Sequence, residues 1–177
     1  MRKTLFELIL FAMFGAIMFA SRVILAVLPN IHLLGMLVMT LTVVFRVKAL
    51  IPIYIYVMLE GILSGFALWW YPYLYVWTVL WALTMLIPKR TPRKLMFVLC
   101  PVLCALHGFS FGILYAPMQA FLYGYNFEQM LIWIAKGSLF DITHGISNIF
   151  AGMLVLPFSE LIYLLVYKKE LYSKREQ

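Results

Sequence analysis

The chain has 177 residues, of which 65% are hydrophobic and only 12% are charged, and its net charge is +7. Soluble domains contain about 45–50% apolar and about 25% charged residues, so this composition excludes an ordinary soluble domain. It predicts an integral membrane protein in which residues 1–177 form one compact domain.

Apolar runs follow one another along the whole chain. Since a bilayer core needs about 20 apolar residues per helix, we expect an all-α integral membrane fold with six transmembrane helices in one bundle. The runs lie at about residues 5–28, 31–45, 49–68, 69–87, 95–115 and 130–167. Segment 116–129 has the mixed composition of an interfacial segment, and the sixth run is long enough for its first turns to lie along the interface.

The basic residues gather in short clusters between these runs. All but two of the 14 Lys and Arg residues fall at the termini, between the second and third runs, or between the fourth and fifth. Membrane proteins keep such clusters on the cytoplasmic side, so both termini are predicted to be cytoplasmic. The positive charge thus indicates topology, and we expect no nucleic acid partner. The two exceptions, Arg22 and Lys136, lie in the first and sixth runs.

The sixth run carries three polar side chains of different chemistry. Asp141, His144 and Asn148 are spaced i, i+3 and i+7, which places them within roughly 60° on one helix face. Polar side chains inside a membrane usually face the protein interior. Two interpretations follow: hydrogen bonds that hold helices together, or a binding site in the outer half of the span.

The fifth run adds a second stripe, since His107, Phe111 and Tyr115 follow at intervals of four residues. Gly108 and Gly112 form another stripe suited to close helix contact. We expect His107 and Tyr115 to face a ligand at the outer end, although a lone histidine within a membrane is often only a packing residue.

Further candidates lie near the same outer end. Trp70 and Tyr71 belong to the aromatic stretch WWYPYLYVW, typical of a membrane interface but also able to stack on a planar ligand. Asn30 lies in the turn after the first run. Glu60 lies in the middle of the third run. We expect it either to pair with Arg22 or a histidine, or to form an ion pair with a cationic ligand.

Signatures of catalysis and metal binding are missing from the sequence. It contains no GxSxG, HExxH or P-loop motif, and no metal-ligand spacing of Cys and His. We therefore predict that the protein is not an enzyme and that it has no catalytic residue, metal or cofactor. Cys100 and Cys104 are expected to be buried packing residues.

A stripe of small residues marks the first run, where Ala12, Ala16 and Ala20 recur every fourth residue. With this stripe, the six runs and the outer polar site, the chain resembles the substrate-binding S component of an energy-coupling factor (ECF) type vitamin transporter. The resemblance implies a prokaryotic cell membrane, and an alanine face that docks on a transmembrane T subunit driven by two ATPase subunits. The alternative for the stripe is packing inside the chain.

The finer similarity is to thiamine-type members of that family. The stretches LPN, HGFSFGILY and HGIS are similar to segments of those members, which implies that His107, Tyr115 and His144 line the pocket. Those members use an acidic residue in the fourth helix, where this chain has Trp81. The resemblance therefore does not identify which vitamin is bound. The alternatives are a structural or assembly membrane protein, or a small stand-alone transporter.

Overall fold

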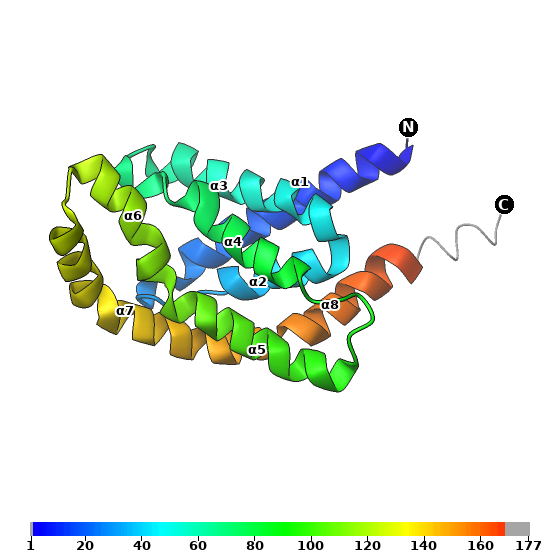
Figure 1. Ribbon diagram of the computed structural model, residues 1–177. Coiled ribbons are helices and arrows are strands. Elements are labelled where there is room, and N and C mark those ends of the chain that lie inside the picture. Colours follow the sequence, from blue (N-terminus) through cyan, green and yellow to red (C-terminus); the bar gives the residue numbers. More distant parts are fainter. Residues whose placement is uncertain (1, 169–177) are drawn as a thin grey trace.

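In the computed structural model, residues 2–168 are described, and within them the chain is helical without strands (Figure 1). The main helices are α1 (Arg2–Ile24), α2 (Leu34–Phe45), α3 (Leu50–Ser64), α4 (Tyr73–Met85), α5 (Arg93–Phe109), α6 (Phe111–Tyr123), α7 (Phe127–Met153) and α8 (Val155–Tyr163). Between and after them lie the short 3-10 helices η1 (Leu25–Val27), η2 (Arg46–Ala49) and η3 (Leu68–Trp70) and the π-helix η4 (Leu164–Lys168). The predicted C-terminal basic residues Lys169, Lys174 and Arg175 lie outside the described residues.

Several of these helical stretches are long and apolar enough to cross a membrane. Three qualify directly: Leu5–Val27, Leu34–Ser64 and Arg93–Tyr123. A fourth is formed by Phe127–Met153 and Val155–Tyr167 together, if this pair with its bend of 40° counts as one span. The prediction of an all-helical, multi-pass membrane protein is therefore confirmed in this coarser form.

The second and third predicted runs fall largely within one apolar helical stretch, Leu34–Ser64, and the fourth, which contains α4, is not among these candidate spans. Helix boundaries differ from the predicted runs in two further places. The segment predicted to be interfacial after residue 115 is helical as far as Tyr123, because α6 continues the direction of α5. The sixth run does not form one straight helix, since it bends between α7 and α8 at Leu154.

Contacts along α1 and α3 show that these helices run side by side in the same direction. Near their beginnings Lys48 Nζ lies 2.7 Å from Glu7 Oε2, and near their ends Arg22 Nε lies 3.1 Å from Glu60 Oε1. Between these two ion pairs, Gly15 of α1 packs against Ile55 of α3.

The second half of the chain forms an antiparallel pair, with α5 and α6 on one side and α7 and α8 on the other (Figure 1). Arg93 at the start of α5 pairs with Glu160 of α8, while Gly112 of α6 bonds to Asp141 of α7. One end of the molecule therefore holds residues 46–48, 87–94 and 159–168, and we call it the basic end. The opposite end, which carries all three histidines, is the histidine end.

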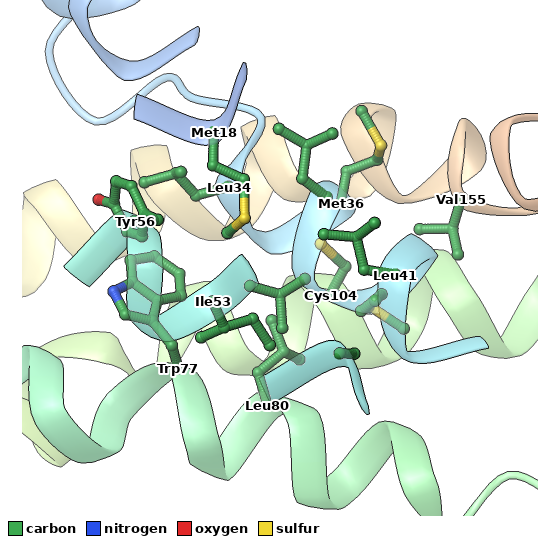
Figure 2. Packing of buried hydrophobic residues seen from close by; sticks show 14 of the residues in the cluster. Met18, Leu34, Met36, Leu41, Ile53, Tyr56, Trp77, Leu80, Cys104 and Val155 are labelled. Carbon is green, nitrogen blue, oxygen red and sulfur yellow. The ribbon is translucent and has the colours of Figure 1, made fainter. Parts of the chain in front are cut away.

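The core is built around α2, which is buried over most of its length. A helix that is apolar on all sides is expected to be surrounded by other helices. Figure 2 shows its side chains meeting those of α3 and α4, with Ile53, Trp77 and Leu80 among the fully buried ones. Cys100 and Cys104 are free thiols within this core, as the sequence predicts.

Candidate functional site

A cluster of aromatic and imidazole rings lies inside the histidine end, centred on Trp77 of α4. Its indole centroid lies 5.7–6.1 Å from the centroids of five surrounding rings: His32, Tyr56, Tyr73, His107 and Phe111. These rings come from the 1–2 loop and from α3, α4, α5 and α6. Aromatic pairs prefer such edge-to-face or tilted arrangements at 4.5–7 Å, so the cluster is closely packed.

His144 of α7 completes the cluster. Its ring centroid lies 4.4 Å from that of His32 and 4.9 Å from that of Phe111. All three histidines of the chain therefore meet in one place, although they lie far apart in the sequence. We call these seven side chains the histidine cluster: His32, Tyr56, Tyr73, Trp77, His107, Phe111 and His144.

Several nitrogen atoms of this cluster are buried without a hydrogen-bond partner among the described residues. They are Nδ1 of His32, Nδ1 of His107, Nε2 of His144 and the indole Nε1 of Trp77. The other ring nitrogen of His107 lies 3.1 Å from the Val76 carbonyl oxygen, which fixes the orientation of that ring. Most buried polar atoms in native proteins are paired, so four unpaired nitrogens together indicate a place where polar ligand atoms can bind.

His32 belongs to the loop between η1 and α2, outside the membrane-spanning helices. Burial, together with electrostatic repulsion from His107 and Arg22, lowers the pKa of His32 to about 4. This imidazole is therefore neutral at pH 7 and offers one donor and one acceptor nitrogen.

Asp141 and Asn148, predicted with His144, are indeed buried on the same face of α7, but both bind backbone of neighbouring helices. Asp141 Oδ1 accepts a hydrogen bond of 3.0 Å from the Gly112 amide in the first turn of α6. A carboxylate at a helix N-terminus satisfies a free amide and favours the helix dipole. Asn148 Nδ2 donates to the Cys104 carbonyl at 3.2 Å. These bonds match the interhelical interpretation that the sequence left open.

Glu60 is fully buried, and the structure shows which of its expected partners it meets. Its Oε1 pairs with Arg22 at 3.1 Å, and its Oε2 accepts a hydrogen bond from Ser64 at 3.3 Å. Arg22 keeps 38% of its side chain exposed. The carboxylate is therefore already neutralised by this chain's own cation.

The remaining predicted site residues lie at different distances from the cluster. Tyr115 stacks on Phe111 and donates its hydroxyl to the Trp69 carbonyl. Asn30, with φ of 60°, is held to α7 because its carbonyl accepts a bond from Ser147. Both flank the cluster at its border.

Trp70 and Tyr71 are not brought into the cluster. The Trp70 indole donates to the Val57 carbonyl at 2.8 Å, and its ring packs edge-on against Phe66 and Tyr71. Tyr71 is 41% exposed. Trp77, one helical turn beyond Tyr73 on α4, lies at the centre of the cluster, where Trp70 and Tyr71 were expected from the sequence. The i, i+4 spacing of Tyr73 and Trp77 could have indicated that these two rings share a helix face.

The alanine stripe of α1 lies on the surface. Ala12, Ala16 and Ala20 are exposed, whereas Phe11 and Met18 on the other side of the helix are buried against the rest of the bundle. The stripe therefore does not pack inside this chain, the alternative that the sequence left open.

Comparisons with known proteins identify no relative. No protein family matches the sequence, and neither a curated protein nor a solved structure is significantly similar to the chain. Within residues 2–168, no group of three His, Cys, Asp or Glu side chains is placed to hold a metal ion. The functional conclusion therefore depends on the geometry of the histidine cluster and of the alanine stripe.

Proposed function

We propose that this protein is the membrane-embedded substrate-binding subunit of an energy-coupling factor type importer, taking up a small water-soluble vitamin or vitamin precursor. The observation that carries the proposal is the histidine cluster. A few orienting polar atoms among largely aromatic side chains are typical of the lining of a small-molecule site. A protein in which these rings only packed together would have little use for four unpaired buried nitrogens.

A bundle of six crossings with both termini on the cytoplasmic side is part of the proposal. The contacts that support it are those that fix helix direction: α1 runs alongside α3, and α5 runs opposite to α8. Arg46 of the 2–3 connection also donates to the carbonyl oxygens of Met85 and Ile87, which places the 2–3 and 4–5 connections together. All these basic connections belong on the cytoplasmic side.

In the proposed mechanism, a planar ligand enters at the histidine end and stacks on the aromatic rings around Trp77. The unpaired nitrogens of His107, His144 and Trp77 form hydrogen bonds with its polar edge. His32 touches His144, so the 1–2 loop that carries it moves aside for the ligand and then covers it. Neutral imidazoles can donate or accept, which suits heteroaromatic rings bearing both kinds of group.

Energy for uptake comes from partner subunits in this proposal, since the chain has no P-loop. The exposed alanine stripe is the docking face for the transmembrane T subunit. Small side chains let helix backbones approach closely, and such packing drives helix association in lipid. Two ATPase subunits then complete the importer.

A thermal-shift panel of vitamins on the purified protein tests the receptor function. A ligand at 100 times its Kd stabilises the native state by about 2.7 kcal/mol, so one compound should raise the melting temperature clearly. Thiamine and its precursors are the first compounds to include, because of the sequence resemblance.

A matched pair of variants ties the shift to the cluster. His144→Ala should remove the ligand-induced shift, whereas Thr143→Ala should retain it, because the Thr143 hydroxyl binds the Leu139 carbonyl of its own helix, on the exposed face of α7. If no compound stabilises the wild-type protein, the polar face of α7 only holds helices together and the chain is a structural or assembly protein.

A further inference from the structure

A cavity lies at the basic end of the described part of the chain, away from the histidine cluster. Its volume is about 850 Å³, and it lies where the end of α2, the 4–5 connection, the start of α5 and α8 meet. That volume is within the range of about 300–1,000 Å³ typical of small-molecule sites. The transport mechanism proposed above makes no use of it.

The lining of this cavity is divided between apolar and basic side chains. Val44, Met96 and Leu156 form an apolar floor, and Met96 and Leu156 are buried. The rim carries Arg46 and Lys89. A ligand that matches both parts has an anionic group joined to a hydrocarbon portion.

The rim charges are available to such a ligand. The Arg46 guanidinium donates to the carbonyl oxygens of Met85 at 2.7 Å and Ile87 at 3.2 Å, which holds it in place. Arginine has five N–H donors, so others stay open to an anion. Among the described residues Lys89 has no ion-pair partner.

Negative charge within the lining is already compensated. Glu160 is its single carboxylate, and it pairs with Arg93 of the same lining at 2.7 Å. The lining thus has a net positive charge, supplied by Arg46 and Lys89.

We propose that this cavity is a specific site for an anionic phospholipid, whose phosphate meets Arg46 and Lys89 and whose acyl chain covers the apolar floor. Basic pockets between transmembrane helices bind anionic lipid headgroups in this way. A free anion would make no use of the apolar floor, and a zwitterionic lipid would bring a second, positive group toward the basic rim. The proposal depends on the membrane assignment and not on the transport function.

Native mass spectrometry of the full-length protein in neutral detergent tests this site. We expect one phosphatidylglycerol to be retained more tightly than a phosphatidylcholine with the same acyl chains. Lys89→Gln should weaken phosphatidylglycerol binding about fivefold, since one cation near an anionic lipid is worth about that factor. Lys94→Gln is the matched control, because Lys94, in the first turn of α5, belongs to the same basic end but does not line the cavity.

A variant that strengthens lipid binding provides a second test, because misfolding could weaken binding but would not strengthen it. Glu160→Gln removes the one carboxylate and releases Arg93, so it should strengthen phosphatidylglycerol binding about fivefold. The proposal is overturned if both lipids bind equally, if Lys94→Gln weakens binding as much as Lys89→Gln, or if Glu160→Gln has no effect. Displacement of the lipid by millimolar inorganic phosphate would also overturn it, in favour of a free-anion site.

Discussion

The contact between α5 and α7 yields the most direct test of the fold around the histidine cluster. These two helices approach each other at glycines, one residue beyond His107 and one beyond His144. A Cβ atom at Gly108 would lie 2.8 Å from Asn148 Nδ2 and 2.9 Å from both the N and the Cα atoms of Gly145. Two of these three neighbours are backbone atoms of α7, which cannot move without the whole helix.

Gly108→Ala should therefore destabilise the protein. Adding a methyl group to a closely packed interface costs about 1–3 kcal/mol, and the better helix propensity of Ala returns about 0.5–1 kcal/mol. The net loss is about 1–2 kcal/mol, or roughly 2–8 °C in melting temperature for a chain of this size. Thermal unfolding of the detergent-solubilised variant, followed by tryptophan fluorescence, measures this change.

Gly137→Ala supplies the matched control on α7, because a Cβ atom there has nothing within 4 Å. It should raise the melting temperature slightly through helix propensity alone. Equal stability of Gly108→Ala and Gly137→Ala would refute the close backbone approach of α5 and α7. Since the same approach sets the distance between His107 and His144, Gly108→Ala should also weaken binding of any ligand found in the vitamin panel.

Three further predictions concern the surface, the ion pair and the loop. Ala16→Trp should leave the melting temperature of the isolated protein unchanged but prevent co-purification with a T subunit, whereas Gly15→Trp should unfold it, because Gly15 packs against α3. Arg22→Gln should cost about 1–3 kcal/mol by leaving the buried Glu60 carboxylate unpaired, and adding Glu60→Gln should restore most of that stability in chemical denaturation. His32 has a folded-state pKa of about 4 against an ordinary 6.5, so its contribution is complete above pH 6.5 and should fall by up to about 3 kcal/mol as the pH decreases toward 4. The difference between wild-type and His32→Gln denaturation midpoints over that pH range measures it.

The parts of the site that follow helical periodicity could be predicted from the sequence. The spacing of Asp141, His144 and Asn148 is enough to place them on one face, and the cost of exposing polar groups to lipid turns that face inward. The alanine stripe was predicted in the same way. In both cases, however, periodicity identifies a face and does not identify what the face contacts.

The members of the histidine cluster outside α7 depend on tertiary contacts, and this is where the sequence interpretation was incomplete. His32 lies in a loop without periodicity, and only the packing of that loop on α7 brings it against His144. Trp70 and Trp77 belong to one aromatic stretch. The Trp70 indole donates a hydrogen bond to the Val57 carbonyl, whereas the Trp77 indole has no hydrogen-bond partner among the described residues. The spacing of Tyr73 and Trp77 hints at this difference, but the hydrogen bond that holds Trp70 is made to α3 and is not encoded locally.

The break between α5 and α6 was also beyond local rules. Pro101 and Pro117 are both inside helices, yet the chain breaks at Ser110, where no proline stands. Just after this point the Asp141 carboxylate accepts a hydrogen bond from the Gly112 amide, which supplies a partner for one N–H in the first turn of α6. The partner comes from α7, about 30 residues later in the chain, so only the folded protein reveals it.

Asp141 therefore holds α6 to α7, a role that the sequence did not separate from contact with a ligand. Two substitutions distinguish these two roles. Asp141→Ala removes the acceptor for the Gly112 amide and should lower both stability and ligand affinity. Asp141→Asn keeps a carbonyl oxygen for that amide, so if Asp141 acts only by holding α6 to α7, this variant should resemble the wild type in both measurements. A wild-type melting temperature combined with lost affinity for Asp141→Asn would instead show that the charge of the carboxylate contacts the ligand. We expect Asp141→Asn to resemble the wild type, because Asp141 Oδ1 binds the Gly112 amide of α6 and the unpaired nitrogens of the cluster belong to the histidines and Trp77.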